Sequence, residues 1–279
     1  MGAMNYRHAF HAGNFADVVK HLALISILSH LKKKEAGFAV VDTHAGRGVY
    51  DLGSEEARRG GEAEAGIGRI AGIADGPETL QTYLRLAEGP RYPGSPLIAA
   101  RLIRPQDRLV AIEKHPDDAK TLAATLSPFR RARTVEGDGY ARLPALLPPP
   151  ERRGLVLIDP PYEAPGEFGQ AARAVAAALE RFATGIVMIW FPIKSAPAAA
   201  AFAGEVLAAG PRKALRLDVE VAAQAETKQG GARTGRLAAA GLLVVNPPYG
   251  FAADMRQALD IVAPRLDGTA RLDWLAGAE

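Results

Sequence analysis

The tetrapeptide Asp159-Pro160-Pro161-Tyr162 combines a carboxylate, two prolines and an aromatic ring, residue types that could hold and activate the exocyclic amine of a nucleobase. Such an amine is a poor nucleophile because its lone pair is delocalised into the ring, and its two N–H groups need acceptors. The Asp159 carboxylate can accept one N–H, and a carbonyl of the turn can accept the other, because the prolines remove competing backbone donors. Tyr162 offers a flat face on which a base can stack. We therefore predict that Asp159, Pro160 and Tyr162 are catalytic, although Asp and Pro are also common in ordinary turns.

The position of the tetrapeptide agrees with this chemistry. It directly follows the apolar run 155–158, which is typical of a buried parallel strand, so it leaves the carboxyl end of a sheet, where open α/β folds bind ligands. Acids also follow three other predicted strands: Asp42, Glu113 and Asp138. Glu113 stands where a carboxylate would bind ribose hydroxyls, and Asp138 where one would accept from an adenine amine. Each of these acids could instead cap a helix.

The loop after Asp42 is a small-residue turn, which lets the backbone approach a ligand closely. Gly46 and Gly48 fit the common S-adenosylmethionine loop, but His44 occupies the place of its first glycine. A dinucleotide fingerprint would need glycine at position 51, where the chain has Asp51. The loop therefore disfavours nicotinamide and is compatible with S-adenosylmethionine.

Composition excludes several classes of site. The 279-residue chain has no cysteine, which excludes disulfides, iron–sulfur clusters, cysteine-ligated zinc and a cysteine nucleophile. His8 and His11 lack further ligands at metal-binding spacing, so we expect no metal. No apolar stretch reaches the length of a membrane span and the start has no signal-peptide pattern, so we expect a cytoplasmic protein. The net charge of +3 is weakly basic. The local basic clusters are candidate phosphate contacts or ordinary solvated surface; they are Lys32–Lys34, Arg58-Arg59, Arg130-Arg131 with Arg133, and Arg152-Arg153.

The elements that position these residues follow an α/β alternation. Asn14, with Asp17 three residues later, predicts the start of a helix whose apolar positions keep helical spacing to Leu31, before Gly37. The predicted strands are 38–41, 109–112, 133–136, 155–158, 185–190, 214–221 and 237–245, and helices between them include 116–126, 168–182 and 196–209. This order predicts a Rossmann-like, mostly parallel sheet in which the last strand is antiparallel and pairs with the one before it at one edge.

A second motif of similar form, Asn246-Pro247-Pro248-Tyr249, also follows an apolar strand. Because this strand is predicted to be antiparallel, its carboxyl end should lie at the opposite edge of the sheet from Asp159. We therefore predict that the second motif is a structural turn.

The segment between Gly48 and Leu109 is longer by about 40 residues than one βα unit needs. It predicts an inserted helical subdomain with a helix over 77–88 and a rigid loop at 92–96 that returns to the sheet. We divide the chain into residues 4–50 (arm, helix and first βα unit), 51–105 (inserted subdomain) and 106–279 (remainder of the core).

Several motifs together resemble those of a known family. They are Tyr6–Asn14, Ala16–Val18, Lys20-His21, Asp42–Gly46, Tyr92–Ala99 and Leu157–Glu163. The family is that of the J-type 23S ribosomal RNA large-subunit methyltransferases, class I enzymes that transfer a methyl group from S-adenosylmethionine to N6 of one adenine, position 2030 in rRNA numbering. The resemblance spans almost the whole chain.

The resemblance implies roles for individual residues. The positions that match cofactor contacts are His21, His44, Ser95, Glu113, Asp138, Gly139 and Asp159. Asp159 also matches the catalytic acceptor, and Tyr6 matches a residue near the RNA. On this basis we expect a monomeric enzyme that methylates 23S rRNA, either protein-free or in an early large-subunit particle. An adenine-N6 DNA methyltransferase, or a nucleic-acid-binding protein that keeps the fold without turnover, remains open at this point.

Overall fold

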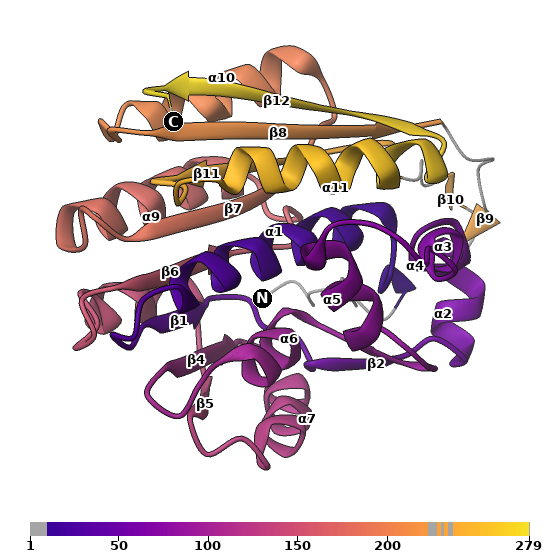
Figure 1. Cartoon of the computed structure of the whole chain (residues 1–279), viewed down its shortest axis with the longest axis horizontal. Coiled ribbons are helices and arrows are strands. Elements are labelled where there is room, and N and C mark those ends of the chain that lie inside the picture. Colours follow the sequence, from indigo (N-terminus) through magenta and orange to yellow (C-terminus); the bar gives the residue numbers. More distant parts are fainter. Residues whose placement is uncertain (1–9, 223–227, 230–231, 234–236, 279) are drawn as a thin grey trace.

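An eight-stranded sheet forms the centre of the molecule in a computed structural model that describes residues 10–222, 228–229, 232–233 and 237–278 (Figure 1). The strands are β1 (Ala39–Asp42), β4 (Arg108–Glu113), β5 (Ala132–Glu136), β6 (Gly154–Ile158), β7 (Ile186–Pro192), β8 (Ala214–Val221), β11 (Ala239–Val245) and β12 (Gly268–Ala276). Their order is β12-β8-β11-β7-β6-β1-β4-β5. The five strands from β7 to β5 are parallel, which confirms the predicted Rossmann-like class.

The C-terminal strands confirm one expectation and correct another. β8 and β11 pair in antiparallel fashion, as predicted, and β11 is also antiparallel to β7. However, this pair does not form the edge, because β12 pairs with the outer side of β8. β12 alternates polar with apolar residues over 269–274, which is the pattern of a half-buried strand, so the sequence contained a signal for β12 that the prediction did not include.

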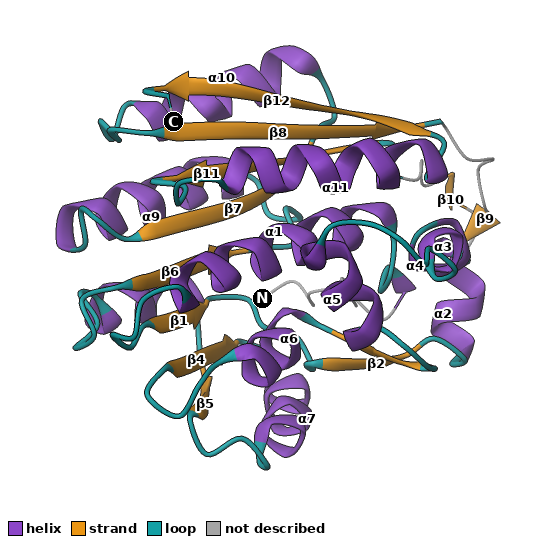
Figure 2. Cartoon of the chain, viewed as in Figure 1, coloured by secondary structure: helices purple, strands orange, loops and turns teal. Residues whose placement is uncertain are grey.

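Helices cover both faces of the sheet (Figure 2). One face carries α1 (Phe15–Lys32), α6 (Ser95–Leu102), α7 (Pro116–Leu126) and α11 (Phe251–Arg265), and the other carries α8 (Gly139–Arg142), the 3-10 helix η2 (Leu143–Leu146), α9 (Glu167–Arg181) and α10 (Ala196–Leu207). No helix in the described part of the chain combines the length and apolarity that a membrane span needs.

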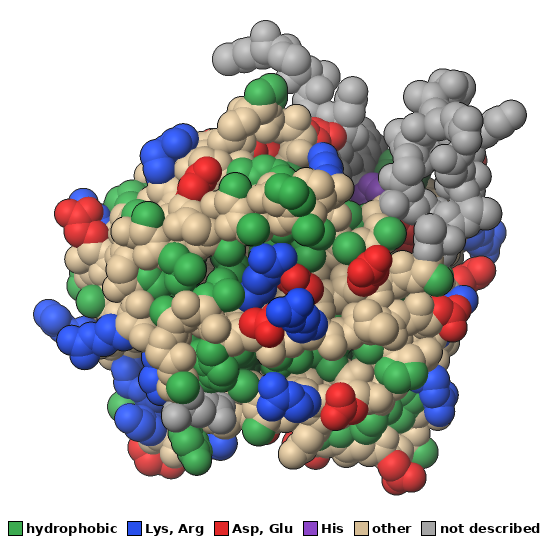
Figure 3. All heavy atoms as spheres, turned by 90° about the horizontal axis from the view of Figure 1, so that it is seen from above, with side chains coloured by type: hydrophobic (Ala, Val, Ile, Leu, Met, Phe, Trp, Pro, Cys, Tyr) green, Lys and Arg blue, Asp and Glu red, His purple; other side chains and the backbone are tan. Residues whose placement is uncertain are grey.

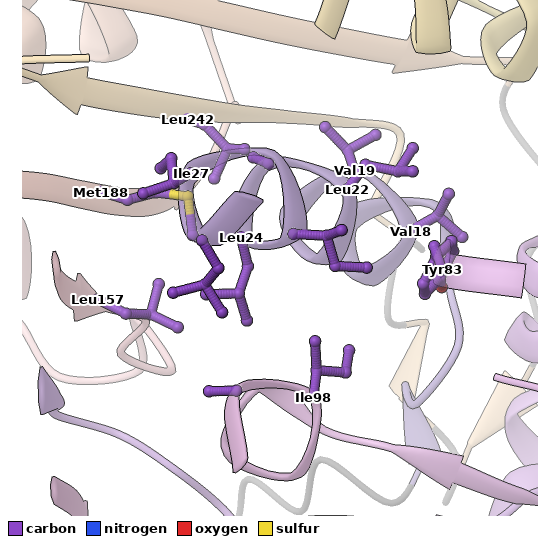
Figure 4. Close-up of a cluster of buried hydrophobic side chains, with 14 of the residues drawn as sticks. Val18, Val19, Leu22, Leu24, Ile27, Tyr83, Ile98, Leu157, Met188 and Leu242 are labelled. Atoms are coloured by element: carbon purple, nitrogen blue, oxygen red, sulfur yellow. The ribbon is translucent and has the colours of Figure 1, made fainter. Parts of the chain in front are cut away.

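Helix α1 lies inside one of the two hydrophobic cores. It begins where the Asn14 side chain accepts a hydrogen bond from the Asp17 N–H, as the sequence predicted. It packs between the sheet and the helices α5 (Glu78–Leu86), α6 and α11, so almost all of its surface is buried. Figure 4 shows its side chains among residues of the sheet, α6 and α5; the labelled residues are Val18, Val19, Leu22, Leu24, Ile27, Tyr83, Ile98, Leu157, Met188 and Leu242. Any charged residue on this helix must therefore find a partner within the protein.

The segment between β1 and β4 contains short helices and one pair of short antiparallel strands. In chain order and followed by α6, they are β2 (Val49–Asp51), α2 (Glu55–Gly60), α3 (Glu62–Ala65), α4 (Ile67–Ile70), α5 (Glu78–Leu86) and β3 (Arg91–Pro93). Outside this segment, two further short strands, β9 (Lys228–Gln229) and β10 (Ala232–Arg233), pair with each other. β2 and β3 place Tyr50 opposite Tyr92 and lead directly into Ser95 at the start of α6. The division of the chain at residues 51 and 105 stays a prediction.

Candidate active site

The four strand-end acids lie along one edge of the sheet. Asp42 ends β1, Glu113 ends β4, Asp138 follows β5, and Asp159 follows β6. Because these strands are parallel and adjacent in the order β6-β1-β4-β5, the acids follow one another as Asp159, Asp42, Glu113 and Asp138. At about 4.8 Å between strands, the series extends over about 14 Å. We call this the catalytic edge.

A buried lysine of α1 holds Asp159. Lys20 Nζ lies 2.5 Å from Asp159 Oδ2 and 2.8 Å from Asp17 Oδ1. Burial alone would lower the pKa of Lys20, but the charges of Asp159 and Asp17 outweigh it and raise that pKa well above its ordinary value. Lys20 therefore stays protonated and fixes Oδ2 of Asp159. The other oxygen, Oδ1, makes no hydrogen bond within the described residues, so it is open to a ligand.

Asp42 is buried beside this ion pair. Ser95 Oγ donates to Asp42 Oδ2 over 2.7 Å, because the pairing of β3 with β2 brings the start of α6 to the end of β1. Burial raises the pKa of Asp42 to about 7, and the negative charge of Asp159 acts in the same direction; the hydrogen bond from Ser95 opposes the increase. Asp42 thus exchanges a proton near neutral pH, and Ser95 is joined to the catalytic edge.

Glu113 fixes the loop that follows β1. Its two oxygens accept hydrogen bonds from the backbone N–H groups of Gly46 and His115, each over 2.8 Å. In the same loop, His44 Nδ1 lies 2.8 Å from the Thr43 hydroxyl. Burial lowers the pKa of His44 to about 4, so its ring is neutral at physiological pH.

Asp138 and Gly139 support the far end of the catalytic edge. Asp138 caps α8 by accepting from the Ala141 N–H and pairs with Lys114 at 2.9 Å, so the helix-cap alternative applies to this acid. Gly139 packs directly on the loop after β1, where an added Cβ would lie 2.0 Å from the carbonyl oxygen of Thr43. A side chain at position 139 would therefore displace that loop.

His21 faces the inserted elements and is 1% exposed. Its Nδ1 lies 2.9 Å from the hydroxyl of Tyr92, which in turn lies 2.8 Å from the hydroxyl of Tyr83. This placement gives His21 two aromatic neighbours that the sequence did not suggest, and its expected contact with the cofactor stays a prediction.

Tyr162 differs from the expectation of an open stacking face. It is 7% exposed, and its ring packs against Phe168, Trp190 and Phe202 in the second core. Its hydroxyl donates to the Trp190 carbonyl over 2.7 Å, and its φ of 53° is left-handed. Tyr162 thus fixes the turn after Asp159, and its ring is not open for stacking, because the apolar surface of Tyr is better buried in the adjoining core than exposed.

A buried polar atom of Tyr140, at the catalytic edge, has no partner among the described residues. The Tyr140 hydroxyl is buried and makes no hydrogen bond within the described residues, and its ring stands edge-on to His44 at 4.8 Å between centroids. The charges of Glu167, Asp138 and Asp159 lie close enough to act on it, and burial raises its pKa. An unpaired hydroxyl beside a row of carboxylates fits a ligand rich in hydroxyl and amino groups, as a nucleoside is.

The second Pro-Pro motif lies at the opposite edge, as predicted. The Asn246 N–H donates to the carbonyl of Lys213, just before β8, and its side-chain amide donates to the carbonyls of Ala183 and Gly185, just before β7. These are the starts of strands whose other ends lie at the catalytic edge. The predicted position of this motif, away from the catalytic edge, is therefore confirmed.

The sequence motifs did not predict where Tyr6 lies or that Lys20 holds Asp159. Tyr6 lies outside the described residues, so its position is not given. Lys20 entered the prediction only as part of a family motif. A signal was present, because Lys20 and Asp17 are charged residues in a largely apolar helix and both therefore need buried partners. Among the described residues, no group of His, Asp and Glu has the arrangement of a metal site.

A family model and two curated relatives assign this chain to the same family. The sequence profile of "Ribosomal RNA large subunit methyltransferase D, RlmJ" matches residues 35–276. Ribosomal RNA large subunit methyltransferase J of Haemophilus influenzae is 38% identical over 98% of this chain and 99% of its own, and that of Escherichia coli is 39% identical over the same shares. The crystal structure of a Legionella pneumophila protein superposes with a TM-score of 0.83 at 28% identity, covering 94% of this chain and 98% of that one. This chain therefore belongs to the J family of ribosomal RNA large subunit methyltransferases, which have the class I methyltransferase fold.

Proposed function

We propose that this protein transfers a methyl group from S-adenosylmethionine to N6 of one adenine in 23S rRNA, the adenine at position 2030. The observation that carries the proposal is the geometry of Asp159. One of its oxygens is fixed by Lys20, the other is open, and two prolines follow it at the carboxyl end of β6. This arrangement suits the exocyclic amine of adenine, whose two N–H groups need hydrogen-bond acceptors.

The residues of the catalytic edge would hold S-adenosylmethionine, which supplies an electrophilic methyl group. We assign the ribose hydroxyls to Glu113 and the adenine amine of the cofactor to Asp138, because both carboxylates keep accepting capacity beyond their present partners. Ser95, Asp42 and the unpaired Tyr140 hydroxyl offer further polar contacts between these two acids and Asp159. His44 and His21 complete the cofactor site in this assignment, and Gly139 keeps the loop in place.

Asp159 and the carbonyl of Pro160 would accept the two N–H groups of the target amine. This pairing draws the nitrogen out of conjugation with the ring and makes its lone pair available. Lys20 keeps the carboxylate oriented, so Asp159 acts as an acceptor and offsets the positive charge on nitrogen until the displaced proton leaves. Tyr162 contributes by fixing the turn.

The target base must leave its stack to reach Asp159, as in other enzymes that modify bases. We assign its positioning to the arm around Tyr6, whose aromatic, guanidinium and imidazole groups suit RNA. Tyr6→Ala should raise the KM for RNA or lower kcat, while the Kd for S-adenosylmethionine without RNA stays unchanged. Weaker cofactor binding with normal RNA kinetics would place the arm in the cofactor pocket instead.

Mass spectrometry of rRNA nucleosides after incubation with labelled S-adenosylmethionine tests the proposal directly. N6-methyladenosine should appear in protein-free 23S rRNA and map to one position. Label in duplex DNA but not in rRNA would favour a DNA methyltransferase, and no cofactor binding by calorimetry would favour a binding protein without turnover. An rRNA substrate also implies a cytoplasmic enzyme, which we expect to act as a monomer.

A further inference from the structure

The edge of the sheet opposite the catalytic edge is strongly basic. It consists of the connections that lead into β1, β4, β5, β6, β7 and β8, residues 33–38, 103–107, 127–131, 147–153, 182–185 and 208–213. These segments contain nine Lys and Arg residues against three Asp and Glu, whereas the whole chain has 34 against 31. Two of the three acids, Asp107 and Glu151, are already paired with arginines. We call these six connections the basic edge.

Part of this charge has a structural role. Arg104 and Arg153 donate to backbone carbonyls at the end of α1, including those of Lys34 and Leu31, which stabilises the helix terminus. Other cations of the basic edge have no such role. Among the described Lys and Arg residues of the basic edge, five have exposed side chains with no hydrogen bond or ion pair: Lys34, Arg130, Arg131, Arg152 and Arg212. The fold does not need these charges, so they are available to a partner.

The basic edge is long enough for a nucleic acid. From Arg130 before β5 to Arg212 before β8 there are six steps between neighbouring strands, or about 29 Å. Along a duplex, this length corresponds to about eight phosphates of one strand. Figure 3 shows Lys and Arg side chains gathered at the lower left border of the molecule, the side from which β6, β7 and β8 start in Figure 1.

An exposed aromatic ring stands on the same edge. Tyr249 is 82% exposed and is the one large hydrophobic side chain among the described residues with this exposure. The turn that carries it is attached to the basic edge, because the Asn246 N–H donates to the carbonyl of Lys213 over 2.9 Å. A ring this exposed contributes little to folding. Beside unpaired cations, it has the composition of a surface on which an unpaired base stacks.

We propose that the basic edge and Tyr249 bind a second segment of the substrate RNA, away from the target adenine. This inference rests on the proposed rRNA substrate. The catalytic edge itself is lined by carboxylates, which repel phosphates, so affinity for the RNA backbone has to come from other surfaces. The cations would contact phosphates on the far side of the sheet, and Tyr249 would stack on a base of a loop or bulge.

The test compares two triple variants with the same loss of charge. The first, Arg130→Gln, Arg131→Gln and Arg152→Gln, removes three cations of the basic edge. The control is Lys120→Gln, Arg256→Gln and Arg265→Gln, three exposed cations of α7 and α11 outside the basic edge. The Kd for protein-free 23S rRNA is measured by filter binding at several salt concentrations, together with the Kd for S-adenosylmethionine and the kcat at saturating RNA.

The basic-edge variant should bind rRNA at least about tenfold more weakly than the control, with a slope of log K against log salt that is less steep by about 2. Its cofactor affinity and kcat should match those of the parent. Tyr249→Ala should weaken binding several-fold without changing the slope, and Tyr249→Phe should restore it, because stacking needs only the ring. Equal Kd and slope in the two triple variants would overturn the proposal and leave an acidic protein as the partner of this edge. Failure of the parent to methylate rRNA would instead refute the proposed function.

Discussion

Replacing Lys20 with methionine tests whether the buried lysine is catalytic or only structural. The substitution keeps most of the side-chain volume but leaves Asp17, which is 2% exposed, and Asp159 without their common cation. Removing one partner of a buried ion pair costs about 3 to 5 kcal/mol. For a chain of this size, each kcal/mol lowers the melting temperature by about 2 to 4 °C, so Tm should fall by about 6 to 20 °C. Turnover should fall by about 10²-fold or more, because Asp159 loses its fixed orientation.

A double variant separates the two roles. Adding Asp17→Asn to Lys20→Met removes one uncompensated charge, and the Asn amide oxygen can still accept from the Gly13 N–H. Much of the lost stability should therefore return in urea unfolding. Turnover measured with rRNA and labelled cofactor should not return, because Asp159 still lacks Lys20. Recovery of both stability and turnover would refute a catalytic role for Lys20, and a parental Tm in Lys20→Met would refute the assigned strength of the ion pair.

Three further outcomes follow from the site and the opposite edge. Asp159→Ala should reduce methyl transfer at least about 10²-fold in a folded protein, since Lys20 keeps Asp17 as a partner; near-normal turnover would remove Asp159 from the mechanism. Asn246→Ala should leave turnover within a few-fold of the parent but lower the free energy of unfolding by about 2 to 4 kcal/mol, because two hydrogen bonds are lost and alanine must adopt a φ of 52°; a loss of turnover at unchanged stability would contradict this. Burial raises the pKa of Asp42 to about 7 from an ordinary value of 3.8. The stability that Asp42 contributes when protonated is therefore present below pH 4 and is lost as the pH rises towards 7, by up to about 4 kcal/mol. In urea unfolding from pH 4 to 8, the free energy of unfolding should depend less on pH in Asp42→Asn than in the parent, and identical profiles would refute the shift.

Periodicity and chain order were sufficient to predict the main features of the fold. The cap at Asn14 fixed the start of α1, and the spacing of acids after apolar runs correctly placed Asp42, Glu113 and Asp138 along one edge. The antiparallel direction of β11 correctly assigned Asn246 to the other edge. These features depend on local patterns and on topology, both of which a single sequence contains.

Features that depend on which distant side chains meet could not be predicted. The orientation of Tyr162 depends on Phe202, which comes 40 positions later on α10, and the partner of Lys20 lies 139 positions away. β12 was missed although its alternation of polar and apolar residues is a strand signal, but its pairing with the outer side of β8 depends on contacts that the pattern does not specify. A tyrosine after a strand can either pack its ring against other aromatic side chains or leave the ring exposed. Local sequence alone does not decide which of the two Tyr162 adopts.

The placement of α1 has a consequence for how the protein is made. This helix packs against α5 and α6, which follow it closely in the sequence, but β8, β11 and α11, which cover the rest of its apolar surface, come much later in the chain. At about 5 to 20 residues per second, Asp159 is synthesised about 7 to 28 s after Lys20, and α11 later still. During this interval the part of α1 that β8, β11 and α11 will cover stays exposed, which favours binding by a chaperone. The ion pair that orients Asp159 forms only after β6 has been synthesised, so a nascent chain that ends before Asp159 has no assembled active site.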